Sequence, residues 1–214
     1  MSRPSGDPLD KLMVALGSLT GRRVGRDDRR RFQQYLDLFL RWNRTHRMTA
    51  LDDAAAIVQD LFIDSLLFLS LLPPARPIAL MDIGAGAGIP GLPLCLADPG
   101  ITVTMVEARR KRVSFLLAAQ RELDLANVAV REGRAEVLLE QEPDLASAFD
   151  VVVARSVGPA ASLLPLARNY LKIGGLFAVS GPPNPPPQEP FEIVRVAIPG
   201  TRKSRVFLMA AKEG

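Results

Sequence analysis

Apolar residues in the first third of the chain recur at the spacing of an α-helix. The positions i, i+3, i+4, i+7 and i+10 of one stripe are held by Leu9, Leu12, Met13, Leu16 and Leu19. Two further runs, 32–42 and 57–72, repeat this spacing, which predicts three amphipathic helices. Pro73, Pro74 and Pro77 then interrupt the helical pattern. We therefore expect an N-terminal helical cap over residues 1–73 and a second unit over residues 74–214.

From Ile78 onward, short and almost continuously apolar runs alternate with helical ones. The runs with strand character are 78–83, 102–106, 128–130, 150–154 and 176–180, and the helical runs among them are 92–97, 111–123, 135–139 and 160–171. Strands of this kind are typical of a parallel sheet that helices cover on both faces. We predict an α/β, Rossmann-like fold with a doubly wound, mostly parallel sheet.

The C-terminal part departs from this alternation. Residues 191–198 and 206–211 form two strand-like runs around Pro199-Gly200, with no helix between them. Consecutive strands joined by a short connection pair antiparallel, so we expect an antiparallel hairpin at the sheet edge. The proline-rich segment 182–190 before it predicts an extended connector.

Charge is unevenly distributed along the chain. The 214 residues include 27 Lys and Arg against 23 Asp and Glu, and segment 22–47 alone contains nine arginines and three aspartates. A basic helical surface of this kind suits a polyanion such as RNA. A helix face that contacts only solvent carries similar charges, so the composition alone leaves both readings open.

Several protein classes are disfavoured by what the sequence lacks. Cys95 is the only cysteine, which excludes an internal disulfide and a cysteine-based zinc site. We expect no bound metal. Asp7 and Asp10 stand where an export signal would be apolar, and the apolar stretch 61–72 is short for a membrane span and contains Asp64. We expect a cytoplasmic monomer with no membrane partner.

The most specific motif begins at the end of the first predicted strand. Residues 81–91 read Met-Asp-Ile-Gly-Ala-Gly-Ala-Gly-Ile-Pro-Gly, and Glu107 ends the next predicted strand 24 residues after Ile83. Glycines let the backbone turn sharply and approach a ligand closely; here they are Gly84, Gly86 and Gly88. An acidic residue about twenty residues further on accepts ribose hydroxyls. This layout predicts a nucleotide-containing cofactor.

Asp82 distinguishes between the possible cofactors. A carboxylate ahead of the first glycine suits the ammonium group of S-adenosylmethionine (SAM) and repels a pyrophosphate. A dinucleotide stays a competitor because Gly86, Gly88 and Gly91 formally satisfy its fingerprint. A tight turn that binds no ligand is the third alternative. We interpret the motif as a SAM site and predict a methyltransferase.

Candidate contacts follow from the position of each residue, because a ligand lies beyond the carboxyl ends of parallel strands. We predict that Asp82 receives the SAM ammonium, directly or through water, and that Glu107 accepts the ribose hydroxyls. Ile89 and Ala135 would flank the adenine, with Glu136 near it. Arg155 ends the fourth predicted strand and is a candidate for positioning the acceptor.

The acceptor is constrained by missing groups. C5 methylation of pyrimidines needs a cysteine nucleophile, and Cys95 lies in the predicted helix after the glycine turn. The Asn/Asp-Pro-Pro-aromatic motif for exocyclic amines is replaced by Ala-Arg-Ser-Val at 154–157. A purine ring nitrogen is already nucleophilic and needs orientation rather than a strong base, provided that the nucleotide is unpaired or swung out of its stack. No catalytic base is assigned.

A set of segments between Tyr35 and Gly181 carries a family resemblance. The segments are Trp42-Asn43, Thr49-Ala50, 63–66, 82–93, Glu107, Lys111-Arg112, Phe115-Leu116, 134–136 and 154–156. Together they resemble the bacterial small-subunit (16S) rRNA guanine-N7 methyltransferase family, also called glucose-inhibited division protein B. The Gly-Ile-Pro-Gly-Leu-Pro and Asp-Ser-Leu stretches are far more specific than the glycine turn. The chain departs from the family pattern at Arg47, Phe62 and Ser180.

The resemblance implies methyl transfer from SAM to N7 of a guanine in the decoding-region loop of 16S rRNA, with the rRNA or the small ribosomal subunit as partner. It places cofactor contacts on Gly84, Ile89, Ala135, Glu136 and Arg155. The helical cap would then contact RNA through Arg22, Arg23, Arg26, Arg30, Asn43, Arg44, His46 and Arg47. The alternatives are a methyltransferase of the same fold for another RNA or a small molecule, and a cofactor-binding ribosome-assembly protein without turnover.

Overall fold

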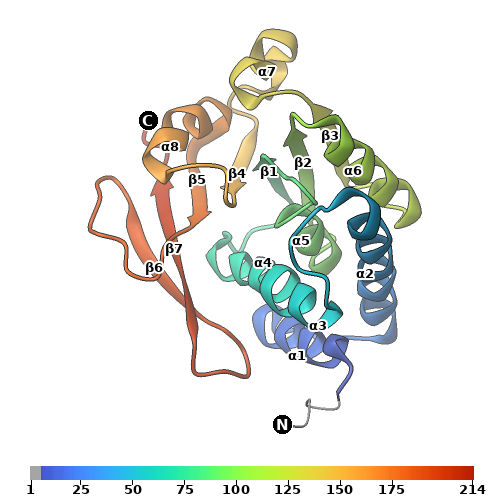
Figure 1. The fold of residues 1–214 in the computed structure, drawn as a ribbon. Helices are drawn as coiled ribbons and strands as arrows, with labels where there is room; N and C mark the ends of the chain where they lie inside the picture. Colours follow the sequence, from blue (N-terminus) through green and yellow to red (C-terminus); the bar gives the residue numbers. More distant parts are fainter. Residues whose placement is uncertain (1–5) are drawn as a thin grey trace.

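A computed structural model describes residues 6–214, so the first five residues of the predicted helical cap lie outside the described part. A seven-stranded sheet with the order β3-β2-β1-β4-β5-β7-β6 forms its centre (Figure 1). The strands are β1 (Ile78–Ile83), β2 (Ile101–Glu107), β3 (Val128–Glu132), β4 (Phe149–Ala154), β5 (Leu171–Ser180), β6 (Glu192–Ala197) and β7 (Ser204–Ala211). Strands β1 to β5 run parallel, and the order reverses between β1 and β4. The predicted doubly wound sheet is confirmed.

Alternate residues of the central strands face opposite layers of helices. On β4, Val151 and Val153 belong to one buried cluster, whereas Val152 and Ala154 belong to the other. Both faces are covered, which explains why these strands are apolar at nearly every position. The helices that connect the strands are α5 (Gly91–Ala97), α6 (Arg110–Glu122), α7 (Ala135–Gln141) and α8 (Ala160–Tyr170), with a 3-10 turn η3 (Pro143–Leu145) after α7.

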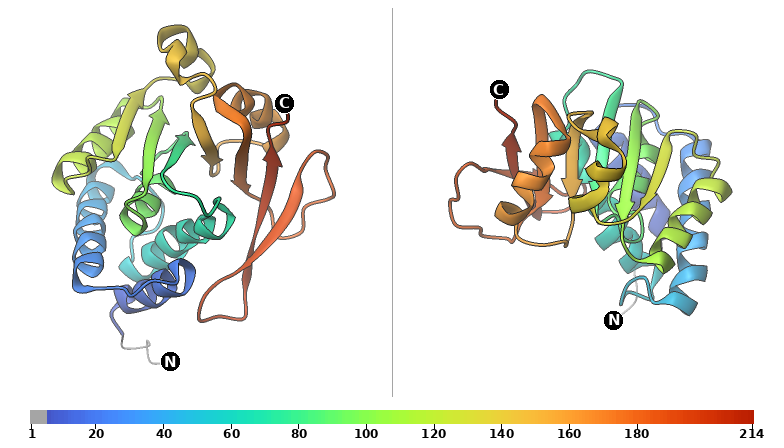
Figure 2. Two further views of the ribbon diagram at one scale, coloured as in Figure 1. Left: turned by 180° about the vertical axis from the view of Figure 1, so that it is seen from behind. Right: turned by 90° about the horizontal axis from the view of Figure 1, so that it is seen from above.

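The N-terminal helices lie against the α5 and α6 side of the sheet (Figures 1 and 2). They are α1 (Pro8–Thr20), α2 (Arg26–His46), α3 (Ala54–Ile57), the π-helical turn η1 (Val58–Ile63), α4 (Asp64–Leu66) and the 3-10 turn η2 (Leu67–Leu71). Their apolar stripes share one buried cluster with the sheet, in which Leu12 and Phe32 are fully buried together with Leu80. The division of the chain after residue 73 stays a prediction.

The segment from α3 to η2 is a long apolar helical run. By length and composition alone, Ala54–Leu71 is apolar enough to cross a membrane, and 56% of it is buried inside the fold. Phe62 lies stacked on Tyr35 of α2 at a centroid distance of 4.5 Å, and Phe68 packs edge-on against Phe207 of β7. Its apolar residues therefore pack against α2 and the sheet as a core helix would.

The C-terminal strands form the predicted hairpin at the sheet edge. Strand β7 pairs antiparallel with both β5 and β6. Strand β5 begins at Leu171 rather than near residue 176, because Leu171 pairs with Phe149 before a register shift in β4. The hairpin brings Arg205 back toward the N-terminal helices, where it pairs with Asp64.

Candidate functional site

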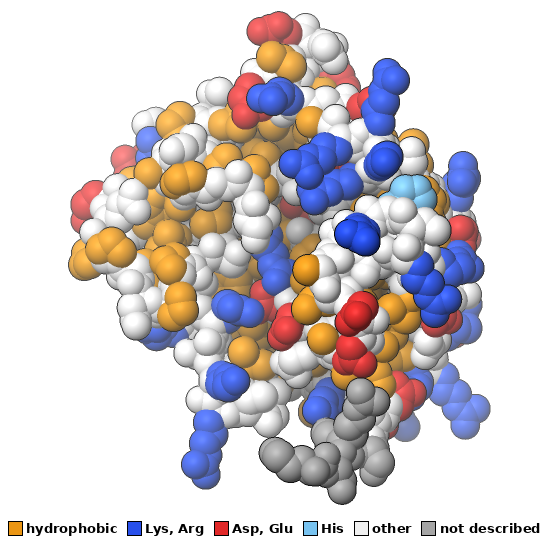
Figure 3. All heavy atoms as spheres, in the orientation of Figure 1, with side chains coloured by type: hydrophobic (Ala, Val, Ile, Leu, Met, Phe, Trp, Pro, Cys, Tyr) orange, Lys and Arg blue, Asp and Glu red, His pale blue; other side chains and the backbone are white. Residues whose placement is uncertain are grey.

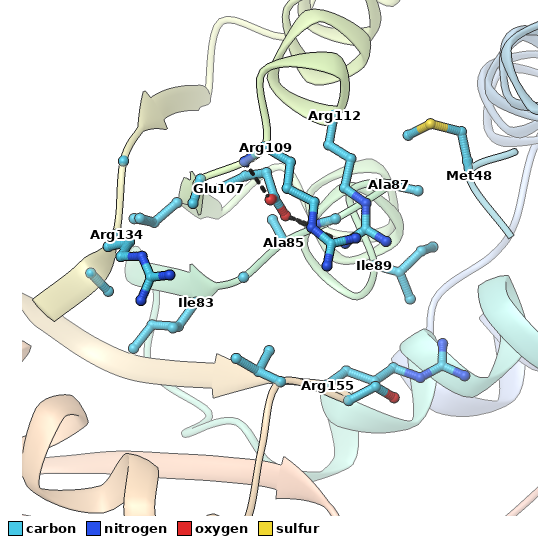
Figure 4. A pocket seen from close by; sticks show the side chains of 18 of the residues that line it. Met48, Ile83, Ala85, Ala87, Ile89, Glu107, Arg109, Arg112, Arg134 and Arg155 are labelled. Carbon is cyan, nitrogen blue, oxygen red and sulfur yellow. Dashed lines mark hydrogen bonds and ion pairs between the residues drawn. The ribbon is translucent and has the colours of Figure 1, made fainter. Parts of the chain in front are cut away.

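A cavity of about 510 Å³ opens at the carboxyl ends of the central strands (Figure 4). Its wall combines the glycine turn after β1, the end of β2, the loop before α7 and the end of β4. Of the predicted cofactor contacts, seven line it: Gly84, Gly86, Ile89, Glu107, Ala135, Glu136 and Arg155. The topology therefore brings together residues that are up to about seventy positions apart, as expected for the point where strand order reverses.

The glycine turn has a backbone shape that glycine alone adopts easily. Gly84 has φ +69°, and a Cβ on it would lie 2.7 Å from Val157 Cγ2. The Gly84 N–H donates to the Val106 carbonyl at 2.8 Å, which ties the turn to β2. Tyr35 of α2 supports the same turn, since its hydroxyl donates to the Ala87 carbonyl at 2.9 Å. These contacts fix the turn, and its glycines leave mainly backbone atoms facing the cavity.

Glu107 is buried at the end of β2 and is held by backbone donors. Its Oε2 accepts the Gly86 N–H at 2.9 Å, and its Oε1 accepts the Arg109 N–H at 2.8 Å. Arg112 lies 3.8 Å away on the first turn of α6. A carboxylate offers about four acceptor positions, so two vicinal hydroxyls can still bind. Glu107 is therefore fixed in orientation and chemically suited to a ribose.

Asp82 lies near the end of β1, beneath the glycine turn. Its side chain is fully buried, and its Oδ2 accepts the Gly91 N–H at 2.8 Å. Its contact with the SAM ammonium, directly or through water, stays a prediction, and the residue does not contribute to the cavity wall. The reason is local: the turn folds over the end of β1 to begin α5. Burial raises the pKa of Asp82 to about 7, and its Oδ1 has no hydrogen-bond partner among residues 6–214.

Gly88 also lies outside the cavity wall. It has φ +77°, and a Cβ there would lie 2.3 Å from Leu92 Cδ1. The position therefore requires glycine for the turn into α5, and the contact of Gly88 with the cofactor stays a prediction.

Arg155 follows the last residue of β4 and lines the cavity. Its Nη2 lies 3.1 Å from Asp64 Oδ2 and donates to the Asp60 carbonyl at 2.7 Å. Its Nη1 is buried and has no partner among residues 6–214. Burial lowers the pKa of Arg155, and the Asp64 carboxylate opposes that change. The guanidinium is thus anchored on one nitrogen and unpartnered on the other.

The remaining predicted contacts, Ile89, Ala135 and Glu136, also line the cavity. Ala135 begins α7, and its carbonyl accepts the Tyr170 hydroxyl at 2.5 Å. Glu136 is exposed at the cavity mouth, and Ile89 comes from the end of the glycine turn. Apolar side chains with a carboxylate in the same cavity suit a purine ring with a donor edge.

Sequence reasoning missed two parts of the cavity. The first is contributed by the N-terminal helices and the loop after α2, through Phe39, Met48, Thr49 and Leu61. The second is a basic rim of Arg109, Arg112 and Arg134, labelled in Figure 4. Arg109 and Arg134 each follow a strand end by two residues, and Arg112 lies in the first turn of α6; these positions were the available signal. Arg109 and Arg134 make no side-chain ion pair with residues 6–214, whereas Arg112 is paired with Glu107.

The residues expected to bind RNA separate into two groups. Arg22 pairs with Asp28 at 2.7 Å and donates to the Ala97 carbonyl, and Asn43 binds the Leu51 carbonyl and the Thr49 N–H. These two side chains form hydrogen bonds within the protein and so form the first group. The exposed members are Arg23, Arg26, Arg30, Arg44, His46 and Arg47, of which Arg30 makes a 3.4 Å pair with Asp27.

Lys and Arg side chains gather over α2, α6 and the strand ends, around the one histidine of the chain (Figure 3). The His46 ring lies against Trp42 at a centroid distance of 4.7 Å, and Trp42 packs edge-on against Phe115. Trp42 is half-buried and lies at the margin of the core. The basic surface continues from the helices to the cavity mouth.

Cys95 does not belong to the site. Its thiol is buried in α5 and donates to the Leu92 carbonyl, and burial raises its pKa to about 12. Among residues 6–214, no three His, Cys, Asp or Glu side chains form a group that would hold a metal ion.

The fold defines the class of protein: a Rossmann-like α/β domain of the kind found in solved SAM-dependent methyltransferases. A SAM-dependent methyltransferase from Aquifex aeolicus superposes with a TM-score of 0.54 at 17% identity, covering 77% of this chain and 96% of that chain. A putative methyltransferase from Escherichia coli gives 0.52 at 18% identity, covering 71% and 85%. At these identities the likeness establishes the fold alone.

The chain belongs to the family described as rRNA small subunit methyltransferase G, whose model matches residues 28–181. A relative of that name from Sorangium cellulosum is 43% identical over 143 residues, covering 66% of this chain and 59% of the relative. Another from Lachnoclostridium phytofermentans is 36% identical over 146 residues, covering 68% and 60%. The matched segment spans about three fifths of each. The resemblance stated from the sequence is confirmed.

Proposed function

We propose that this protein transfers a methyl group from SAM to N7 of a guanine in small-subunit (16S) rRNA, in the cytoplasm. Membership of the rRNA small subunit methyltransferase G family supports the reaction class and the RNA. The chemistry of the cavity supports the cofactor and the kind of acceptor.

Two buried atoms of opposite charge carry the proposal. Asp82 Oδ1 and Arg155 Nη1 are the buried side-chain polar atoms without a partner in residues 6–214, and the charges of the two groups interact. An unpartnered buried polar group costs about 1–3 kcal/mol, so one in the cavity wall and one beneath the adjoining glycine turn favour a ligand that reaches both. The amino-acid end of SAM is a zwitterion, whose ammonium complements Asp82 and whose carboxylate complements Arg155.

The rest of the cavity fits the nucleoside end. Glu107 would hold the ribose hydroxyls, and Ile89 and Ala135 would flank the adenine, with Glu136 toward its amino group. Gly84 and Gly86 leave the space that side chains would fill. When bound, SAM supplies an electrophilic methyl group on a sulfonium centre. The residues around it bind, orient and exclude water.

The acceptor follows from what the cavity lining contains. Among the lining residues there is no histidine and no cysteine, and Glu107 is already bound to two backbone N–H groups. Methylation of guanine N7 uses a free ring lone pair and removes no proton, so holding the base in line is sufficient. The thiolate needed for pyrimidine C5 chemistry is not supplied by Cys95, whose thiol is buried.

Radiolabelled SAM tests the proposal directly. The purified chain would be incubated with labelled SAM and either small ribosomal subunits or naked 16S rRNA, both lacking the modification. Borohydride reduction followed by aniline cleaves RNA at N7-methylguanosine and maps the site. We expect one labelled guanine. Label on a pyrimidine or an exocyclic amine would refute the acceptor, and calorimetric binding of NAD instead of SAM would refute the cofactor.

A further inference from the structure

Asp64 is a charged residue in the middle of an apolar helical run. It begins α4, its side chain is 3% exposed, and the neighbouring Ile63 and Leu66 are buried. A buried carboxylate is strongly unfavourable unless it is paired and hydrogen-bonded. The Asp64 carboxylate is therefore unfavourable by itself, and the residues that pair with it indicate its role.

Two arginines from distant elements pair with this carboxylate. Arg155 at the end of β4 contacts Oδ2 through Nη2 at 3.1 Å, and Arg205 of β7 donates to Oδ1 through Nε. The three residues connect the N-terminal helices, the cavity and the edge hairpin. One negative charge faces two positive ones, so the cluster keeps an excess positive charge beside the cavity.

Asp64 and the π-helical turn before it fix the orientation of Arg155. The Asp60 carbonyl, in η1, accepts the same Nη2 at 2.7 Å. Because both protein contacts converge on Nη2, the guanidinium plane cannot rotate without breaking them, and Nη1 stays unpartnered. Helical turns of the π type occur often at functional sites, and here one aims a carbonyl at a cavity residue.

We propose that Asp64 is a positioning residue for methyl transfer, acting through Arg155. The inference rests on the proposed function, since Arg155 is assigned there to the SAM carboxylate. Without the Asp64 charge, the Arg155 side chain keeps only the Asp60 carbonyl as an anchor and turns away from its present orientation toward solvent. The methionine end of SAM is then held less tightly, and the methyl group is out of line with its acceptor.

A double-mutant cycle separates this role from a purely structural one. Misplacement of reacting groups by about 1 Å costs about 100-fold in rate, so we expect Asp64→Asn to lower kcat/KM by about 10- to 100-fold and to weaken SAM binding. In an Arg155→Gln background the same substitution should cost less than about twofold, because the interaction is already lost. Equal losses in both backgrounds would overturn the proposal.

Asp150→Asn is the matched control. Asp150 lies near the opposite end of β4, where it pairs with Lys172 at 2.7 Å and accepts the Ala79 N–H. We expect this variant to lose stability with unchanged kcat and SAM affinity. If Asp64→Asn does not fold, Asp64→Glu, which keeps the charge, takes its place. A smaller loss of kcat/KM in Asp64→Glu that disappears in the Arg155→Gln background supports the proposal.

The two proposals fail in different ways. If the unsubstituted chain binds no SAM and labels no RNA, the proposed function is refuted and the inference with it. If the unsubstituted chain is active and Asp64→Asn and Asp64→Glu match it in kcat, KM and SAM affinity, only the role of Asp64 is refuted.

Discussion

The carboxylate of Asp82 accepts the Gly91 N–H at 2.8 Å, and this contact ties the end of β1 to the start of α5. A Cβ at position 91 would lie 2.9 Å from the same oxygen. The pair therefore depends on glycine for close approach and on a buried acid for the acceptor. The second carboxylate oxygen has no hydrogen-bond partner in the described part of the chain, residues 6–214.

The stability of the protein without cofactor should depend on the protonation of Asp82. Burial raises its pKa to about 7, so the folded chain binds more protons than the unfolded chain between roughly pH 4 and 7, and this group's contribution to stability falls as pH rises through that range. Asp82→Asn keeps an acceptor for Gly91 but cannot ionise. Relative to the unsubstituted protein, we expect its thermal midpoint to gain as pH rises from about 5 to 8. Parallel pH profiles for the two proteins would contradict this.

SAM binding should release a proton from Asp82 when the pH is below its pKa. The SAM ammonium favours the ionised carboxylate and so lowers that pKa. Calorimetric titrations at about pH 6, in two buffers of different ionisation enthalpy, measure the protons released. We expect net release, and its disappearance in Asp82→Asn. Buffer-independent heats for the unsubstituted protein would show that the charge state of Asp82 does not change.

Gly84→Ala should weaken SAM binding in addition to the stability that it loses through backbone strain. The new Cβ would meet Val157 at 2.7 Å within the cavity wall. The matched control is Gly200→Ala, at φ +75° with no atom within 4 Å of the added Cβ. Left-handed backbone costs a non-glycine residue about 1–2 kcal/mol, so both variants lose stability. Only Gly84→Ala should also lose at least about tenfold in SAM affinity; equal affinities for the two variants would remove the turn from the site.

The arginines of α2 and its flanks should divide by function. Arg44 and Arg47 are exposed and make no ion pair with residues 6–214, whereas Arg22 is bound to Asp28 and the Ala97 carbonyl. Neutralising a phosphate contact lowers the salt dependence of RNA binding by about one unit of slope. We expect this for Arg44→Gln and Arg47→Gln in filter-binding titrations. Arg22→Gln should lower the thermal midpoint and leave the slope unchanged; the reverse pattern would place the RNA surface elsewhere.

The glycine turn shows how far sequence reasoning reaches into the site. Gly84, Gly86 and Glu107 were identified from spacing alone because a strand end, a left-handed turn and the next strand end are local features that a parallel sheet brings together. The sequence predicts that Asp82 receives the SAM ammonium, directly or through water, but gives no depth for it; in the structure it lies buried beneath the turn. Sequence spacing predicts which face of the sheet a side chain is on. How deeply that side chain is buried depends on how the following helix packs.

The sequence by itself determined the order of helices and strands, the parallel sheet with its edge hairpin and the glycine turn, because periodicity and backbone preference act over a few residues. Only the tertiary structure decided that Asp64 meets Arg155 and Arg205, that Arg109 and Arg134 stand at the cavity mouth, and that Arg22 and Asn43 serve the fold. These contacts join residues up to 141 positions apart. Their partners are set by how whole layers pack, which no local pattern encodes.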